Sequence, residues 1–527
     1  MDSKKSETEH MAAYLKLPSE LLIKIFTIHV ENLLPPPPES PDQPPLPYHE
    51  IEPSEWLWFT HVCRYWRDVA LGTPTLWSTP DFRFPTIAIE LLKRAQSAPL
   101  TLNLAISISG ICKSRPNTVS EKLGVRVLKE HLPRTVSLEL TAPTEPALER
   151  LLGAATGSAP LLHRLNLRIR VDYQTESLSI PSKFLGGKAP QLREISLDGC
   201  CFSPNSPFLR NLTVLDVTAN SDFLGDLPFS RFVDILRNCP DLEVLGVSGW
   251  LAKSQKSKKE IVPVDLPRLR RLTVVTTMSV CLQVITTLRL PISARIHLGC
   301  LLEPQFTKHA LYEAMSRILI SSLGSPTGGK PVKEISCLQL ELISEVQNIS
   351  CTAWDNTPRG QQPKPVFDLD LFIPEFMDFP SDQEYSRTIL EATPLSNLRA
   401  LQVEELVLSK DIVTEFLCPL PNLRLLDLAG ESTAAAFVTV LGDTLKGKNG
   451  TQDPEKMVFP ALKVLNLTET LFGPHRRGSE TKASLLASLA HRQERGAGIE
   501  SLRLTNCVGV LQSDVDKLQK IVSEVTM

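Results

Sequence analysis

The chain has 527 residues, of which 42% are hydrophobic and 22% are charged. A chain of this length is too long to fold around one small hydrophobic core, so we expect several domains or an extended repeat array. Because 56 Lys and Arg residues oppose 59 Asp and Glu residues, no overall charge steers the protein toward nucleic acid or an anionic membrane, and we expect neither as a partner.

The N-terminus and the cysteines indicate an intracellular protein. Residues 1–13 are predicted to be disordered, the first seven residues lack an apolar signal core, and no run of about 18 apolar residues occurs. Eleven cysteines without any Cys-x-x-Cys pair favour reduced, mostly buried thiols over disulfides or zinc ligands. We therefore expect a cytoplasmic and/or nuclear protein with no cofactor and no bound metal.

The stretch from Leu17 to Trp77 is predicted to contain two short amphipathic helices. Pro18 suits the first helical turn, because its missing N–H would lack a partner there. Apolar residues then recur at helical spacing on one broad face, namely Leu21, Leu22, Ile25, Phe26 and Ile28. A second apolar set continues until Gly72 and Pro74 end the helix, and it comprises Trp56, Phe59, Val62, Cys63, Trp66 and Ala70.

These two helices carry more apolar surface than they can bury alone. Segments below about 40 residues rarely hide enough surface to be stable. Each Leu, Ile or Phe left in water forgoes roughly 1.5–3 kcal/mol, so four or five of them docked on a partner would support micromolar or tighter binding. We therefore interpret the stretch as a docking module. The alternative is a helical cap that packs on the following domain and binds no partner.

The same residues carry a resemblance to a known family. The motifs Leu-Pro-x-Glu-x-x-x-x-Ile-Phe, Val-Cys-Arg-x-Trp-Arg and Thr-Pro-x-Leu-Trp begin at Leu17, Val62 and Thr73. They resemble an F-box, and the chain is similar to the fungal group that joins an F-box to leucine-rich-repeat-like sequence. The resemblance implies that residues 14–80, with a Pro-rich insertion at 33–50, bind the Skp-type adaptor of a cullin-based ubiquitin ligase. It assigns the adaptor contacts to Leu17, Pro18, Leu21, Ile25, Phe26, Val62, Cys63 and Trp66.

From residue 160 onward the pattern Pro-x-Leu-x-x-Leu-x-Leu recurs, with Ile or Val allowed at the later apolar positions. Copies begin at Pro160, Pro190, Pro240, Pro267, Pro421 and Pro460, and weaker copies without proline begin at Leu212, Leu398 and Leu502. The last two apolar residues of each copy alternate, which predicts a strand with one buried face. Because segments of helical spacing precede several copies, helix, proline turn and strand form the repeated unit, at intervals of roughly 20 to 39 residues.

This repeat predicts the fold class. We expect an α/β protein in which the helical F-box is followed, over residues 81–527, by an irregular leucine-rich-repeat-like solenoid with a curved parallel sheet and outer helices. The residues between the leucines would line its concave face, and most of them are expected to be solvated strand positions. They are Arg193, Ser196, Glu243, Gly246, Arg270, Thr273, Arg424, Asp427, Lys463 and Asn466.

Residues 278–395 interrupt the repeat. Strands are still predicted at 295–298 and 335–340 and a helix at 311–323, whereas residues 356–365 have the composition of a loop. At the C-terminus, Ser513 is expected to cap a helix that covers the last repeat. This helix would carry Val515, Leu518, Ile521, Val522 and Val525.

Three motifs resemble binding or catalytic sites but lack the neighbouring residues or elements that such sites require. Residues 324–330 satisfy the first seven positions of a phosphate-binding loop, yet Pro331 replaces the magnesium-binding Ser or Thr and no strand precedes the loop. The basic residues 253–259 are expected to form a solvated loop. Asp368 and Asp370 alternate as outward residues of a strand, and a paired-carboxylate role would require a further acidic group and a pocket.

We therefore hypothesise a binding protein that performs no chemistry of its own. In this hypothesis it is the substrate-recognition subunit of a cullin-type ubiquitin ligase, whose partners are a Skp-type adaptor, a cullin scaffold and an unknown target protein. Proximity catalysis then requires a rigid junction over residues 81–101. One alternative is an F-box scaffold outside any ligase. Another is an enzyme on a doubly wound α/β sheet, which predicts a glycine-rich turn or clustered polar residues at strand ends, and the sequence offers neither.

Overall fold

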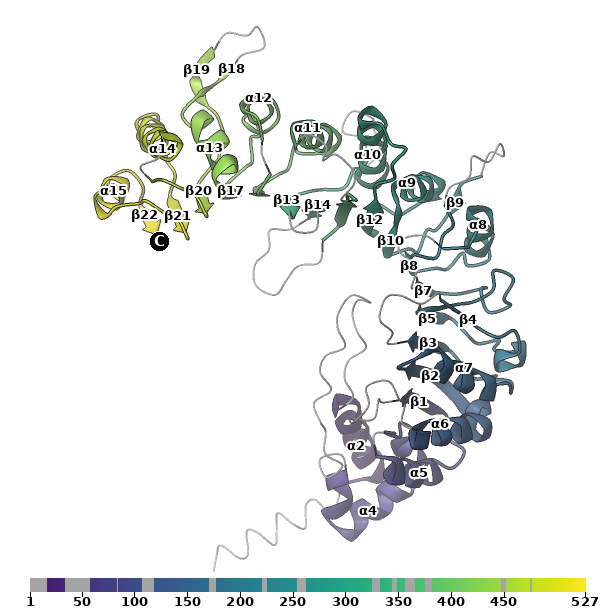
Figure 1. Cartoon of the computed structure of the whole chain (residues 1–527). Coiled ribbons are helices and arrows are strands. Elements are labelled where there is room, and N and C mark those ends of the chain that lie inside the picture. Colours follow the sequence, from purple (N-terminus) through teal and green to yellow (C-terminus); the bar gives the residue numbers. More distant parts are fainter. Residues whose placement is uncertain are drawn as a thin grey trace, which may run out of the picture. The chain divides into compact units, whose positions relative to one another are not determined.

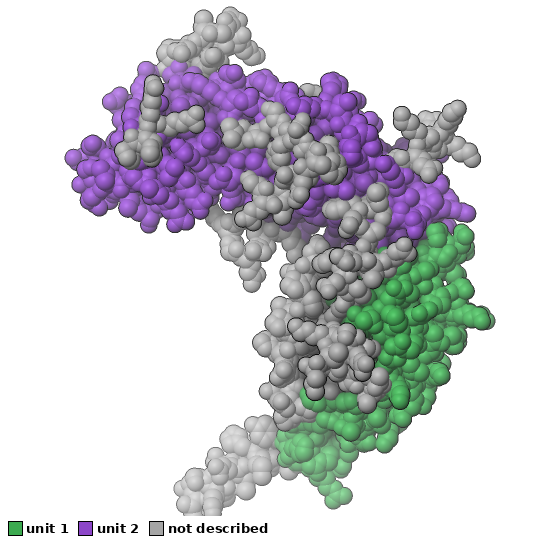
Figure 2. All heavy atoms as spheres, in the orientation of Figure 1, with its two compact units in different colours: residues 1–210 green, residues 211–527 purple. Residues whose placement is uncertain are grey.

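The structure is a computed structural model. It describes residues 17–33, 57–82, 84–106, 118–169, 177–219, 225–253, 262–324, 332–343, 348–355, 365–374, 382–406, 408–446, 452–473 and 476–527. The chain divides into two compact units, residues 1–210 and 211–527 (Figure 2). Within the described ranges, no helix combines the length and the apolar character that crossing a bilayer requires.

The first unit begins with helices and continues with strands. The helices are α2 (Ser19–Leu33), η1 (Trp58–His61), α4 (Arg64–Leu71), η2 (Pro74–Trp77) and α5 (Pro85–Arg94). The following elements are β1 (Leu100–Ala105), α6 (Thr118–His131), η3 (Leu132–Arg134), β2 (Thr135–Ala142), α7 (Glu145–Ala154), β3 (Arg164–Ile169), β4 (Leu178–Ser179), η4 (Phe184–Gly187), β5 (Glu194–Asp198) and β6 (Cys200–Cys201). Strands β1, β2, β3 and β5 pair in this order and run parallel. Short strands β4 and β6 form a separate pair.

The second unit repeats strands and helices. Its first half comprises β7 (Val214–Thr218), α8 (Phe229–Arg237), β8 (Val244–Ser248), β9 (Val264–Asp265), β10 (Arg271–Thr277), α9 (Met278–Thr287), β11 (Leu288–Arg289), β12 (Arg295–Leu301), α10 (Lys308–Leu323), β13 (Cys337–Ile343), β14 (Asn348–Trp354) and β15 (Phe367–Phe372). Its second half comprises α11 (Asp382–Ala392), β16 (Ala400–Glu404), α12 (Lys410–Ile412), η6 (Val413–Leu417), β17 (Leu425–Ala429), α13 (Glu431–Val440), β18 (Thr444–Lys446), β19 (Gln452–Met457), β20 (Val464–Thr468), α14 (Arg476–Glu494), β21 (Ser501–Thr505), α15 (Gln512–Leu518) and β22 (Glu524–Thr526). Helices α9, α10, α11, α13 and α14 follow one side of these strands (Figure 1).

Every predicted copy of the leucine pattern forms a strand at its predicted position. The copies with proline are β3, β5, β8, β10, β17 and β20, and the weaker copies are β7, β16 and β21. The alternation is confirmed as well, because Leu426 and Leu428 of β17 are buried while Asp427 between them is partly exposed. Parallel pairing places Leu426 beside Leu465 of β20, so buried leucines form continuous rows across the strands.

One hydrogen bond before each strand shows why the copies stack in register. The amide of Arg424 donates to the carbonyl of Arg399 (2.7 Å), and the amide of Lys463 donates to the carbonyl of Arg424 (2.9 Å). The amide of Glu500 continues the series to the carbonyl of Lys463 (2.8 Å). Each turn therefore supplies a backbone partner to the next turn, which leaves few orphaned polar groups beside the buried leucines.

The middle of the second unit departs from parallel pairing. Its strand order is β7-β8-β10-β12-β15-β14-β13-β16-β17-β20-β21-β22. Strand β14 pairs antiparallel with both β13 and β15, whereas β12 and β15 are parallel. The predicted strands at 295–298 and 335–340 and the helix at 311–323 are present as β12, β13 and α10. Most of the predicted loop at 356–365 lies outside the described residues.

The predicted C-terminal helix is wrong in its second half. Helix α15 ends at Leu518, its N-cap is Leu511 rather than Ser513, and Val525 lies in strand β22. Val525 pairs with Leu502 of β21 in parallel register. Without β22, the backbone N–H and C=O groups on the outer edge of β21 would lack partners. A short segment with β-branched residues can pair with this edge as a strand, whereas a further helical turn cannot.

Candidate protein-docking site

Helix α2 has two apolar faces, and only one of them is buried. The carbonyl of Pro18 accepts hydrogen bonds from the amides of Leu21 (3.1 Å) and Leu22 (3.2 Å), so the proline marks the start of the helix as predicted. Leu22, Phe26 and Val30 are buried at the spacing i, i+4, i+8. Leu21, Ile25 and Ile28 follow a neighbouring stripe, with 49%, 42% and 47% of their surface exposed.

An aromatic core holds the buried face of α2 against the second helical segment. The ring of Phe26 stacks on Phe59 of η1, with 4.6 Å between centroids, and lies 5.3 Å from the ring of Trp66 on α4. Phe59 in turn lies 6.2 Å from Trp77 of η2. Because Phe26, Phe59 and Trp77 are fully buried, these rings form the interior of the helical domain.

Polar contacts fix the same elements at their ends. The hydroxyl of Tyr65 on α4 donates to the carbonyl of Leu17 (3.1 Å), which ties the start of α2 to α4. The indole N–H of Trp58 donates to Nε2 of His29 near the other end of α2 (2.7 Å). Each contact joins residues distant in sequence, so α2 is held at both ends and its exposed stripe is presented in one orientation.

A junction then connects this domain to β1. The guanidinium of Arg94 at the end of α5 lies 5.1 Å from the ring centroid of Trp77. The amide of Thr101 donates to the carbonyl of Ser78 (3.0 Å), and Asp81 forms a parallel bridge with Asn103 of β1. Contacts of three kinds therefore cross residues 81–101, where the sequence predicts a rigid junction.

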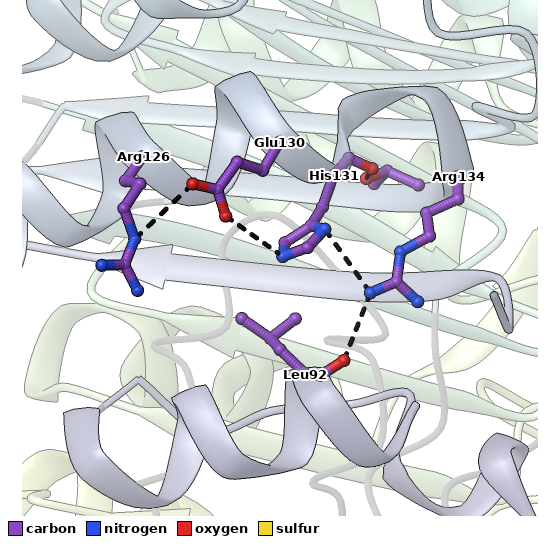
Figure 3. Close-up of polar contacts among 6 residues, drawn as sticks. Leu92, Arg126, Glu130, His131 and Arg134 are labelled. Atoms are coloured by element: carbon purple, nitrogen blue, oxygen red, sulfur yellow. Dashed lines mark hydrogen bonds and ion pairs between the residues drawn. The ribbon is translucent and has the colours of Figure 1, made fainter. Parts of the chain in front are cut away.

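A second set of contacts anchors α5 to the region between α6 and β2 (Figure 3). Arg134 of η3 donates to the carbonyl of Leu92 on α5 (3.4 Å) and lies 3.5 Å from Nδ1 of His131 at the end of α6. Burial, and then the positive charge of Arg134, lower the pKa of His131. The carboxylate of Glu130 opposes this shift and also forms an ion pair with Arg126 (3.9 Å). The uncharged form of His131 therefore suits this junction.

The structure divides the eight predicted contact residues into two groups. Leu21, Ile25 and Val62 are exposed, Pro18 is exposed at the start of α2, and Leu17 is partly exposed. The other group is covered to different degrees: Phe26 and Trp66 are buried in the aromatic core, and Cys63 is partly exposed.

Each residue of the second group has a structural role within the domain. Phe26 and Trp66 support the exposed stripe from below and offer little surface to another molecule. Cys63 is the N-cap of α4 rather than a residue inside the helix, and its Sγ accepts a hydrogen bond from the amide of Trp66 (3.5 Å).

Sequence reasoning missed three exposed apolar residues in this domain. Ile28 was assigned to the apolar face of the first helix but not to the contact set, although it is as exposed as Leu21. Trp58 of η1 and Leu71 at the end of α4 are also exposed. The spacing Leu21, Ile25 and Ile28 was the available signal, because i, i+4 and i+7 follow one line along a helix.

Two of the motifs weighed in the sequence lie almost entirely outside the described residues. In the phosphate-loop-like segment only Gly324 is described, where it ends α10 with a φ of 93°, and residues 325–331 lie outside the described ranges. The basic segment 253–259 is likewise described only at Lys253. Asp368 and Asp370 lie on the outward face of β15, as the alternation predicts.

Elements α2, η1, α4 and η2 form a small helical domain with an aromatic interior and an exposed apolar stripe. Such a stripe is the kind of surface that protein partners cover. Residues 14–83, which contain all of these elements, match the F-box-like family model. F-box domains bind Skp-type adaptors of cullin ubiquitin ligases, so the match suggests an adaptor role in such a ligase. A comparison with curated proteins found no match.

Proposed function

We propose that this chain is the substrate-recognition subunit of a cullin-type ubiquitin ligase. The observation that carries the proposal is the stripe of Leu21, Ile25 and Ile28, which stays exposed on α2 although the neighbouring stripe of Leu22, Phe26 and Val30 is buried. Docking this stripe on a Skp-type adaptor would remove its apolar surface from water, and this burial would favour binding.

The strands that follow the helical domain would bind and present the target protein. Their outward positions carry polar side chains in rows, such as Ser196 beside Asn166 in the first unit and Asn466 beside Asp427 in the second. Stacked parallel strands with helices on one side favour a leucine-rich-repeat-like solenoid, whose free face is the usual binding surface of such repeats. The proposal assigns no chemistry to the chain itself.

Rigidity supports the same mechanism. A receptor raises the local concentration of a target lysine near the activated ubiquitin only if the docking domain and the following strands hold a fixed geometry. At the junction of α5 and β1, two contacts hold the helical domain against the following strands. They are the Arg94–Trp77 contact and the Thr101–Ser78 hydrogen bond.

The test is a matched pair of triple variants in adaptor co-purification. The docking variant replaces Leu21, Ile25 and Ile28 with alanine. The control variant replaces Leu161, Ile292 and Ile320 with alanine. These are also one leucine and two isoleucines, their exposure is comparable, and they lie outside the helical domain of α2, η1, α4 and η2. We expect the docking variant to lose the adaptor while it remains folded, and the control variant to retain it. Equal retention by both variants would contradict the proposal.

A second experiment separates a ligase subunit from an F-box scaffold that works outside any ligase. The chain is reconstituted with adaptor, cullin and ubiquitin enzymes, and proteins that co-purify with it are examined for ubiquitin transfer. Transfer that depends on Leu21, Ile25 and Ile28 supports the ligase role. Adaptor binding without transfer to any bound protein would favour the scaffold.

A further inference from the structure

Three adjacent strands of the second unit bring together a histidine, two aspartates and an asparagine. His297 of β12 pairs with Asp368 of β15, and Asp370 follows two residues later on the same outward face. Asn348 begins β14, which runs antiparallel to β15. The cluster therefore lies where parallel pairing changes to antiparallel pairing.

The ligand atoms of this group are close enough to share one ion. One nitrogen or oxygen from each of His297, Asp368 and Asp370 lies within 4.8 Å of the others. Nδ1 of His297 is 2.9 Å from Oδ2 of Asp368, while the hydroxyl of Thr352 donates to the other oxygen of that carboxylate (2.8 Å). Metal–ligand bonds of about 2.0–2.2 Å place neighbouring ligand atoms roughly 3–4 Å apart, so small side-chain movements complete the geometry.

Asn348 supplies an independent observation. Only 6% of its surface is exposed, and its Oδ1 has no hydrogen-bond partner among the described residues. Its Nδ2 lies 3.5 Å from Oδ1 of Asp370, so the amide is directed at the cluster. A rotation that exchanges Nδ2 and Oδ1 would turn the unpartnered oxygen toward the two carboxylates, and an oxygen in that position is attracted by a cation rather than by the protein around it.

We propose that His297, Asp368, Asp370 and Asn348 bind one divalent first-row transition cation, of which Zn²⁺ and Mn²⁺ are the candidates. An imidazole nitrogen with carboxylate and amide oxygens is a mixed nitrogen and oxygen donor set, which these ions accept and which Mg²⁺ and Ca²⁺ use less readily. Two carboxylates balance the charge of the dication. The ion would join β12, β14 and β15 at the change of strand direction, and this role does not depend on the docking function.

The sequence did not predict this site. We expected no bound metal because the sequence contains no Cys-x-x-Cys pair, and Asp368 and Asp370 could not be assigned a further acidic group or a pocket from the sequence alone. His297 is 71 residues away from Asp368 in the sequence, so only the sheet register reveals their proximity.

The test is a calorimetric titration of the full chain with Zn²⁺, with the thiols kept reduced, and a parallel titration with Mn²⁺ followed by electron paramagnetic resonance. Mn²⁺ disfavours thiolate ligands, so it reports on the oxygen and nitrogen cluster rather than on the buried cysteines. We expect one equivalent to bind. The variants His297→Ala and Asp370→Asn should each weaken binding by at least about tenfold, and Asn348→Ala should weaken it less.

The control is Asp427→Asn, which removes a carboxylate from the same outward face at β17 without touching the cluster. This variant should bind as the unchanged chain does. Thermal unfolding provides a second measurement, because an ion that binds only the folded state raises the melting temperature of the unchanged chain and of Asp427→Asn, but not of His297→Ala. Absence of binding, or equal binding by His297→Ala and the unchanged chain, would overturn the proposal.

Discussion

Helices α2 and α8 have similar sequence patterns but different surroundings. In α8 the apolar residues Phe232, Val233, Ile235 and Leu236 are buried, Phe229 in the first turn is partly exposed, and the remaining positions are polar or charged. In α2 one apolar stripe is buried and the neighbouring stripe is exposed. Amphipathic spacing therefore identifies a helix, whereas a second apolar stripe without a packing partner in the domain marks a candidate docking surface.

The largest expected effect contrasts two adjacent residues of α2. Phe26→Ala removes a ring that contacts Phe59 and Trp66, so it should lower the free energy of unfolding of the helical domain by about 3–5 kcal/mol. Ile25→Ala lies on the exposed stripe and should cost no more than about 0.5 kcal/mol. Urea unfolding followed by tryptophan fluorescence measures both values. Equal losses of unfolding free energy in the two variants would contradict the assignment of Phe26 to the buried stripe and Ile25 to the exposed stripe.

The same contrast is expected within strand β17, where alternate residues face opposite sides. Leu426→Ala leaves a cavity in the buried leucine row and should cost about 2–4 kcal/mol. Asp427→Ala on the outward face removes one hydrogen bond with Asn466 (3.3 Å) and should cost less than about 1 kcal/mol. Denaturant midpoints of the second unit measure these costs, and a larger loss for Asp427→Ala would contradict the assigned register.

The two compact units, residues 1–210 and 211–527, should also differ in how their stability responds to pH. In the second unit, burial lowers the pKa of Lys333 to about 8, although its Nζ donates to the carbonyls of Ala294 (2.6 Å) and Val366 (3.3 Å). Above this value the unfolded chain holds a proton that the folded chain has released. The contribution of Lys333 to stability should therefore rise with pH from about 8 toward 10.5, at up to about 1.4 kcal/mol per pH unit.

The variant Lys333→Met isolates this contribution. Buried cysteines act in the opposite direction at higher pH, because burial raises the pKa of Cys337 to about 11 and that of Cys418 to about 12. The difference in unfolding free energy between the unchanged chain and Lys333→Met, measured from pH 8 to 9, removes their influence. A difference that stays constant across this range would contradict the buried ammonium.

The smallest expected effect concerns His131 in the first unit. Because its pKa is lowered in the folded state, the unfolded chain binds a proton more readily, so its contribution is fully present above pH 6.5 and is lost as the pH falls below that value. His131→Asn should reduce this acid sensitivity. Unfolding midpoints at pH 7.5 and 5.5 provide the comparison, and an unchanged acid sensitivity in His131→Asn would count against the arrangement of Arg134 and His131.

Much of the fold was predictable because its determinants are local. Two leucines at alternate positions after a proline turn predict a strand whatever lies beside it, and each such copy forms one. The helical pair was predictable for the same reason. Strand β14 was not, because its antiparallel pairing with β13 and β15 depends on which segments meet in space.

The exposed stripe of α2 was predictable only in outline. Spacing placed Leu21, Ile25 and Phe26 on one broad apolar face, but the packing of Phe59 and Trp66 decides which part of that face is covered. Sequence spacing likewise placed Cys63 inside a helix that in fact begins one residue later. Burial is a property of the assembled domain, so residues one position apart on a helix take opposite roles.

The most direct test of the proposed function is the affinity of the full chain for a purified Skp-type adaptor, measured by calorimetric titration. We expect the unchanged chain and the control with alanine at Leu161, Ile292 and Ile320 to bind the adaptor equally tightly. The variant with alanine at Leu21, Ile25 and Ile28 should lose at least about tenfold in affinity. Unaltered affinity in that folded variant would contradict the assignment of the exposed α2 stripe as the docking surface.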